Sequence, residues 1–488
     1  PTGHPTGGGV MTVASIGSAR TAQDADSPSS ESQVDPMFVV ALIAAGGMMI
    51  VAGVGLRGSS WILPDGLLGG GVALVAISFM ARGALDVIVA LSPFMFYTLS
   101  PVGGILTVGS SDVMLPVVVG AMIVTAVIGP QVPDRLPKLG AIAPVLLILS
   151  TLVVAGSITG WTIASPDFLL KRSIADAVKL GIGVAYFAVV YLLGRRGGME
   201  TVLRGMRIWG WTATALSIGS LAGITGAVEI IPSDGYRSNG YFEDPNLYAG
   251  YLLVSFSVLL YLSTISTSPW LPAQAVAITG GIVMTGSRGG LVSLLLLVSF
   301  ALVVIHSARL RAMVVGVGGV TFLVGSWLLI NRESGTSILG VDRLFDSSSD
   351  VADDPRIALW ALGIEKWLDA PLWGIGLAQF ERFSGIAFRT ATTSGLGYVT
   401  HNTFLFFLVA FGVIGLGLFL AFMIWVVARV YSAPLLTTAS KHALVSGVVV
   451  LSSQMMTLNL QNLRYVWIYL GLLLAIGALA RDPERRAV

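Results

Sequence analysis

Long apolar runs recur along the whole chain, and they constrain its fold more than any other feature. A helix that crosses the hydrocarbon core of a bilayer needs about 20 apolar residues in a row. Of the 488 residues, 55% are hydrophobic and only 11% are charged, and the mean hydropathy is +0.84. The sequence therefore predicts an all-α, polytopic helical membrane protein and excludes a soluble domain.

Typical span length divides the chain into about fourteen transmembrane spans. We expect about eleven of them in residues 37–330 and about three in residues 402–480. Residues 1–36 are rich in Gly, Ser, Thr, Pro and Asp and predict a disordered tail. Residues 481–488 form a second short tail. The expected spans begin near Met37, Leu63, Ala84, Asp112, Ala141, Ser173, Gly205, Asn246, Trp270, Gly289, Met313, Asn402, Ala443 and Tyr465.

The distribution of Arg and Lys between these spans predicts the orientation. Loops at Arg195, Arg309 and Arg429 carry most of the excess positive charge, and such loops remain in the cytoplasm. Both tails are then cytoplasmic, in a multi-pass protein of the cytoplasmic (inner) membrane. The cations that break this rule lie on the opposite, external face, so they need another explanation.

Residues 331–401 are the one long polar segment, and we expect them to form an external catalytic loop. A helix is predicted inside it, because Asp354 suits the N-cap and Pro355 suits the first helical position. Apolar residues then recur at helical spacing up to Leu368. Two of them are Trp360 and Trp367, so we expect this amphipathic helix to lie on the membrane surface.

Four residues on the external side are candidates for chemistry, and each has a structural alternative. Arg237 lies among aromatic residues and is either a ligand-binding cation or a solvated arginine of an interfacial belt. Arg288 lies between small residues near the hydrocarbon, where it needs a partner or snorkels from a helix end. Arg356 awaits an anion or pairs with a neighbouring aspartate. His401 immediately precedes a span and is either catalytic or structural.

Three arginines and a histidine at one membrane face suit a lipid phosphate or diphosphate. Arginine stays ionised and binds phosphate oxygens through two parallel hydrogen bonds. A histidine that is neutral near pH 7 can accept a proton from a hydroxyl. The chain has no cysteine and four histidines, and the acidic run at residues 346–354 does not fit an EF-hand. We therefore expect no metal and no other cofactor.

Four stretches together resemble the bacterial O-antigen ligase and polymerase family, which is related to membrane glycosyltransferases of the C type. They are YRSNGYFEDPNLYAG, TGSRGGLVSLLLL, DPRIALWALGIEKWLDAPLWGIGLAQF and THNTFLFFLVAFGVIGL, within residues 235–417. The resemblance implies transfer of a glycan from a polyprenyl (undecaprenyl-type) diphosphate to a glycan or glycolipid acceptor, outside the membrane. It implies inversion at the anomeric carbon and no metal.

The same resemblance implies roles for the four candidates. Arg237, Arg288 and Arg356 are expected to bind the donor diphosphate, and Arg288 to assist its departure. His401 is expected to serve the acceptor hydroxyl. The sequence leaves open whether the chain is a ligase or a polymerase. A transporter or flippase for a polysaccharide or lipid-linked glycan is the alternative, and it predicts internal repeats and interrupted helices.

Overall fold

The computed structural model describes residues 83–94, 98–102, 106–109, 143–164, 169–224, 233–234, 237–242, 244–304, 311–312, 314–316, 318–319, 355–388 and 397–482. Several predictions fall outside these residues: the N-terminal tail, the first two spans, the acidic run at residues 346–354 and the proposed N-cap at Asp354.

The described chain is mostly helical, as predicted, and belongs to a multi-pass membrane protein. Three of its helices are long and apolar enough to cross a membrane: 170–222, 245–265 and 403–431. Five shorter apolar helices accompany them within the described residues, and the expected count of about fourteen spans stays a prediction. The main helices are α4 (Ala143–Ala164), α5 (Leu170–Ile224), α6 (Pro245–Ile265), α7 (Trp270–Met284), α8 (Arg288–Val304), α11 (Pro355–Leu368), α12 (Gln379–Phe388), α13 (Thr403–Tyr431), α14 (Thr438–Met455) and α15 (Arg464–Leu479).

Two small antiparallel sheets depart from the all-α prediction. Strand β1 (Thr98–Val102) pairs with β2 (Leu106–Gly109), and β3 (Ser233–Asp234) pairs with β4 (Arg237–Ser238). A short 3-10 helix, η2 (Ser92–Phe94), precedes β1. The β3–β4 pair lies in the connection between α5 and α6.

Helix α5 contains the two spans that were predicted to begin near Ser173 and Gly205. Gly198, at φ 75° and ψ −176°, breaks the helical geometry between them. A positive φ suits glycine because it has no Cβ. The two halves run in opposite directions. The first half runs parallel to α15, because Gly183 approaches Trp467 and Gly194 approaches Ala475. The second half ends where α6 begins, because Ser220 approaches Tyr248.

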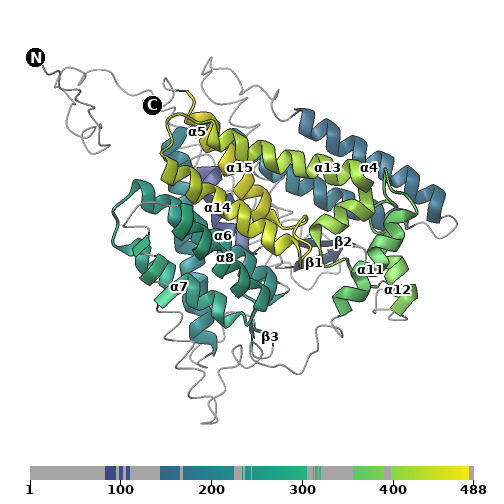
Figure 1. Cartoon of the computed structure of the whole chain (residues 1–488), viewed down its shortest axis with the longest axis horizontal. Helices are drawn as coiled ribbons and strands as arrows, with labels where there is room; N and C mark the ends of the chain where they lie inside the picture. The colour runs from purple at the N-terminus through teal and green to yellow at the C-terminus, as the bar shows by residue number, and fades with distance from the viewer. Residues whose placement is uncertain are drawn as a thin grey trace, which may run out of the picture.

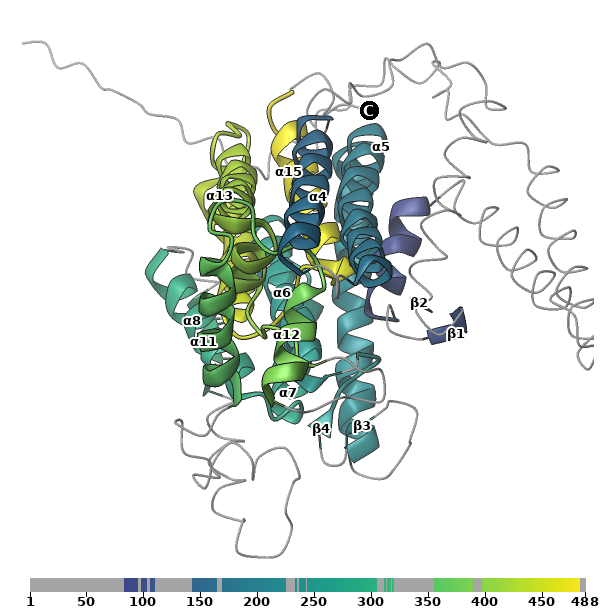
Figure 2. The same ribbon diagram turned by 90° about the vertical axis from the view of Figure 1, so that its right-hand side faces the viewer.

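Hydrogen bonds between helix ends define two ends of the bundle. At the Thr403 end, Gln454 bonds to Gly289 and Thr403 bonds to Leu458. This end holds the first turns of α6, α8, α13 and α15, and the last turn of α14. In Figure 2, α11, α12, β3 and β4 lie together in the lower half of the bundle, while α13 and α15 extend to its upper end.

The opposite, Arg429 end holds the last turns of α8, α13 and α15 and the first turn of α14. There His442 Nδ1 lies 3.0 Å from Val304 O, and Arg481 Nη2 donates to Arg429 O at 2.8 Å. The Gly198 break also lies at this end, because the first half of α5 runs alongside α15. The cations gathered here are Arg195, Arg196, Arg204, Arg207, Arg429, Lys441 and Arg481.

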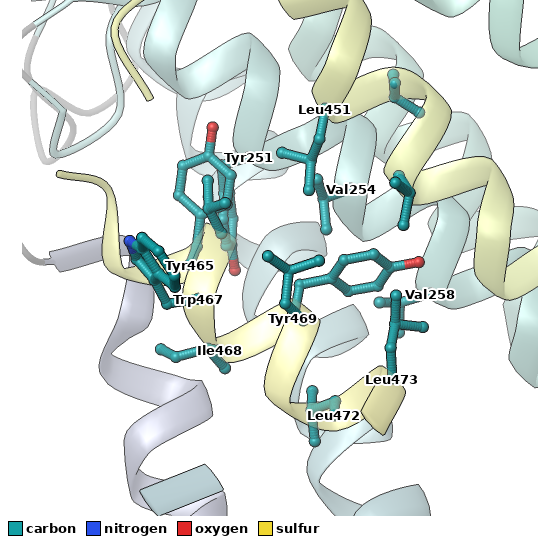
Figure 3. Packing of buried hydrophobic residues seen from close by; sticks show 14 of the residues in the cluster. Tyr251, Val254, Val258, Leu451, Tyr465, Trp467, Ile468, Tyr469, Leu472 and Leu473 are labelled. Carbon is teal, nitrogen blue, oxygen red and sulfur yellow. The ribbon is translucent and has the colours of Figure 1, made fainter. Parts of the chain in front are cut away.

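The core lies where α6, α14 and α15 pack against the second half of α5. Figure 1 shows α6, α7, α8 and α14 on one side of the bundle and α4, α11 and α12 on the other. Trp209 stacks on Tyr251 with ring centroids 5.8 Å apart and donates to Ser255 Oγ at 2.8 Å. Figure 3 shows Tyr251, Tyr465 and Tyr469 among the aliphatic side chains of this core. Dispersion and buried hydrogen bonds stabilise such helix contacts, because lipid tails are as apolar as the core.

Helix α13 is broken at Gly412, which has φ 66° and ψ −168°. The segment 371–378 fills this break. Ile375 N and Gly376 N donate to Val409 O and Ala410 O at 2.8 and 3.1 Å, and Val413 N donates to Pro371 O at 2.9 Å. A broken helix is tolerated in a membrane protein when other protein groups satisfy its backbone. The segment predicted as a polar external loop is therefore partly a buried piece of the bundle.

Candidate functional site

Arg237 lies on β4 and connects two helix ends. Its Nε donates to Thr285 O at 2.8 Å, just after α7, and its Nη2 donates to Asn246 Oδ1 at 3.2 Å, in the first turn of α6. Asp244 is the N-cap of α6, because its Oδ1 accepts from Asn246 N at 2.6 Å. The Asn246 side chain joins Asp244 to Arg237, because its Nδ2 donates to Asp244 Oδ1 at 2.7 Å. This geometry makes Arg237 a partly buried structural cation as well as a candidate ligand.

Arg288 is the first residue of α8, and its side chain is exposed. The turn before it is tight: Gly286 has φ 57°, and Ser287 Oγ accepts from Gly290 N at 3.0 Å. Backbone N–H groups at a helix N-terminus attract anions. Gly290 allows α8 to pack closely on α6, since an added Cβ would lie 2.9 Å from Ala249 Cβ.

His401 lies in the left-handed region of backbone space, at φ 48°. Few residues other than glycine adopt it, although histidine is among those that do so more often. Such strain persists only where the surroundings hold the backbone in place. Asn402, the next residue, caps α13 through a 3.0 Å hydrogen bond from Leu405 N. Loss of such a cap costs about 1 kcal/mol.

The connection between α14 and α15 holds the backbone on both sides of His401. Asn459 Oδ1 accepts from Thr400 Oγ1 at 3.0 Å and from Asn402 N at 2.9 Å. Thr403 Oγ1 donates to Leu458 O at 2.7 Å and accepts from Leu460 N at 2.8 Å. Four hydrogen bonds therefore fix a histidine whose own backbone geometry is unfavourable.

Arg356 lies in the first turn of α11, and its side chain is partly buried. Trp360, one turn later on the same face, donates from Nε1 to Thr400 O at 3.1 Å. Trp367 donates to Pro371 O at 3.1 Å. The helix begins at Pro355 as predicted, and its position on the membrane surface stays a prediction. The face of α11 that packs on α13 brings Arg356 to the side of the loop that carries His401.

The Thr403 end thus contains Arg237, Arg288 and His401, three of the four predicted residues, and Arg356 approaches from α11. Arg237 and Arg288 share the turn between α7 and α8, since Thr285 is three residues before Arg288. The end of α14 and the connection that follows it join that turn to His401: Gln454 Nε2 donates to Gly289 O at 2.9 Å, and Asn459 binds the histidine loop. Two cations, a helix N-terminus and an imidazole are arranged around one connection.

Helix α12 contains a further ionisable group that sequence reasoning missed. Burial raises the pKa of Glu381 to about 7, and the nearby Asp176 carboxylate contributes in the same direction. A backbone hydrogen bond and the cations Arg172 and Lys179 act against this rise. Glu381 also accepts from Gly397 N at 2.9 Å through its main-chain oxygen. Helix α12 therefore holds the segment 397–400, which leads to His401.

Sequence reasoning also missed Gln454 and Asn459. The available signal was a run of amides, Gln454, Asn459, Gln461 and Asn462, between two apolar stretches. Within the described residues there is no group of three or more His, Cys, Asp or Glu side chains placed to hold a metal ion.

Comparison with known families agrees with the resemblance seen in the sequence. Residues 273–420 match the Wzy_C family model, described as O-antigen ligase. The match runs from α7 into α13 and includes Arg288, Arg356 and His401, whereas Arg237 precedes it. It confirms an O-antigen ligase family domain in this membrane protein. No curated protein sequence matches the chain.

Proposed function

We propose that the protein is a membrane glycosyltransferase of the O-antigen ligase and polymerase type. It moves a glycan from a polyprenyl diphosphate to an acceptor hydroxyl on the outer face of the cytoplasmic membrane. The observation that carries the proposal is the joint attachment of the Arg288 turn and the His401 loop to one connection, through Gln454 and Asn459. The family match over residues 273–420 supports the reaction class.

The donor diphosphate is assigned to the turn between α7 and α8. Arg288 supplies two parallel hydrogen bonds to phosphate oxygens. The N-terminus of α8 adds the positive end of the helix dipole. Arg237 adds a second positive charge beside Thr285, and Arg356 a third from α11. As the sugar leaves, negative charge grows on the diphosphate, and these fixed groups stabilise it.

His401 is assigned to the acceptor. Its ring accepts the proton of the attacking hydroxyl, while the acceptor oxygen forms a bond to the anomeric carbon from the face opposite the diphosphate. The bond between that carbon and the diphosphate oxygen breaks, so the configuration inverts. The electron pair leaves with the lipid diphosphate, which the arginines hold. A positioned base contributes roughly 10²–10⁴-fold to such a step.

The proposed transfer is tested by incubating the purified protein with a polyprenyl-diphosphate glycan and a glycan acceptor. We expect glycosylated acceptor and free lipid diphosphate in equal amounts, and undiminished turnover with EDTA, because arginines supply the positive charge. Arg288→Lys should lose most activity, because lysine keeps the charge but not the paired hydrogen bonds. Movement of the intact donor across a vesicle membrane without cleavage would instead identify a flippase.

A further inference from the structure

Gln454 lies in the last turn of α14 and is almost fully buried, at 1% exposure. Its Nε2 makes two hydrogen bonds to the first two turns of α8: to Gly289 O at 2.9 Å and to Ser293 Oγ at 2.7 Å. Because a carbonyl oxygen only accepts hydrogen bonds, the nitrogen of the amide must face Gly289. The orientation of the Gln454 side chain is thus fixed by the residue next to Arg288.

The remaining polar atom of this side chain is costly to bury. Gln454 Oε1 is buried and has no hydrogen-bond partner among the residues that the structure describes. It faces Gly250 of α6, where an added Cβ would lie 3.9 Å from Oε1 and 2.7 Å from Tyr465 Oη. An unpaired buried carbonyl oxygen lowers stability, so an apolar residue of similar size suits this interior better. The two hydrogen bonds to α8 are what a polar residue at this position provides.

Gln454 also lies next to the segment that holds His401. The neighbouring residue is Ser453, whose Oγ lies 2.9 Å from Ser293 Oγ. Asn459, five residues after Gln454, binds Asn402 and Thr400. One short stretch of chain therefore contacts the residues beside the candidate donor ligand and those beside the candidate base. Displacement of α8 from Gln454 therefore changes the distance between Arg288 and His401.

We propose that Gln454 is a positioning residue, which fixes the first turn of α8 and with it Arg288 relative to His401. The inference rests on the proposed function, since it takes Arg288 as a ligand of the donor diphosphate. Gln454 touches neither substrate, so it acts on donor binding through α8. Its loss should therefore raise the KM for the donor and leave the KM for the acceptor unchanged.

The test compares Gln454→Leu, Gln454→Glu and Ser446→Ala with the wild-type protein. Ser446 is a matched control on the same helix, because it is buried and, within the described residues, its hydroxyl bonds only to Ala443 O, 2.7 Å away in its own helix. The probe is farnesyl diphosphate, measured by calorimetry in detergent at pH 6 and pH 8. For Gln454→Leu we expect a dissociation constant raised roughly tenfold or more, with Ser446→Ala unchanged.

Gln454→Glu should bind the probe in a pH-dependent way, which a general loss of structure does not produce. A protonated carboxyl can donate one hydrogen bond to Gly289 O, whereas a carboxylate repels that oxygen. Probe binding should be partly restored at pH 6 and lost at pH 8, relative to the wild-type protein at each pH. The charged and titratable groups nearby are Arg288, Tyr251 and Tyr465, whose side chains ordinarily ionise well above this range.

Arg288→Ala separates failure of this inference from failure of the proposed function. If Arg288→Ala binds the probe as the wild-type protein does, the donor site lies elsewhere and the proposed function fails. If Arg288→Ala loses binding but folded Gln454→Leu keeps it, the positioning role is overturned. If Gln454→Leu does not fold, Gln454→Glu decides, and binding equal to wild type at pH 8 overturns the inference.

Discussion

His401 combines an unfavourable backbone conformation with a side chain suited to proton transfer. Asn459 and Thr403 hold this conformation through four hydrogen bonds. Retention of a left-handed histidine in such a frame supports a hypothesis of function. A purely structural residue at φ 48° is more easily supplied by glycine or asparagine, which adopt this region at less cost.

His401→Asn separates the imidazole from the backbone, since asparagine tolerates the left-handed region. We expect folding and donor binding like those of the wild-type protein, with kcat lowered at least about a hundredfold, because the base is lost. His401→Ala should lose the same activity and also some thermal stability. Single-turnover assays of glycan transfer measure the chemical step directly. Wild-type turnover by the asparagine variant would show that His401 only shapes the loop.

The four candidate residues could be predicted from the sequence, but not the residues that hold them. Arg288 and His401 are conspicuous because a charged or titratable group at the edge of an apolar run has few structural reasons to be there. Asn459 and Gln454 act on residues 57 and 165 positions away. Periodicity reports contacts within one element, so such distant contacts leave no pattern in the sequence.

At the scale of elements, the break in α13 depends on Gly412. Its φ of 66° disfavours any L side chain, and an added Cβ would lie 2.2 Å from the carbonyl of Leu372. The sequence analysis did not predict this insertion, because segment 371–378 is apolar but far shorter than a span, while its backbone replaces the missing hydrogen bonds of α13. Helix α11 was predicted because its apolar residues follow a regular period, whereas no period predicts the insertion.

Gly412→Ala should therefore destabilise the protein by at least about 2 kcal/mol, from left-handed strain and overpacking together. Gly417→Ala, in the same helix, is the control, because an added Cβ there meets nothing within 4 Å. Thermal unfolding in detergent, followed by size-exclusion fluorescence, compares the two. A Gly412→Ala protein as stable as Gly417→Ala would mean that α13 is not broken at this residue.

Helix α12 should give the protein a pH-dependent stability. The pKa of Glu381 is about 7 in the folded protein against an ordinary 4.5, through burial and Asp176. The folded state then binds more protons between these values, so this contribution is complete below about pH 4.5 and is lost as pH rises through about 7. Arg172 and Lys179 limit the effect, since both favour the ionised carboxyl.

Glu381→Gln removes this titration and keeps the shape of the side chain. Its melting temperature minus that of the wild-type protein should increase between pH 5 and pH 8, because only the wild-type protein loses stability over that range. Glu365→Gln on the exposed face of α11 is the control, since the Glu365 side chain is 65% exposed. A difference that stays constant with pH would show that Glu381 is paired or solvated in the folded protein.

At the scale of the whole molecule, the two ends of the bundle carry different sets of charged residues. The Arg429 end gathers Arg429, Lys441 and Arg481, together with the arginines that flank Gly198. The Thr403 end carries the candidate donor and acceptor residues. Cytoplasmic loops retain an excess of Lys and Arg, so the Arg429 end is predicted to face the cytoplasm. The Thr403 end, which carries His401, is then predicted to face outward, as the proposed transfer from a lipid diphosphate requires.

Single cysteines test this orientation cleanly, because the chain has none of its own. Tyr398→Cys marks the Thr403 end and Leu435→Cys the Arg429 end, and the two native side chains are 44% and 37% exposed. Both substitutions keep the backbone hydrogen bonds of these positions, from Ser384 Oγ to Tyr398 O and from Leu435 N to Ala480 O. A membrane-impermeant maleimide should label Tyr398→Cys in spheroplasts and Leu435→Cys only in inverted vesicles. The reverse pattern would place the candidate site in the cytoplasm and rule out transfer on the outer face.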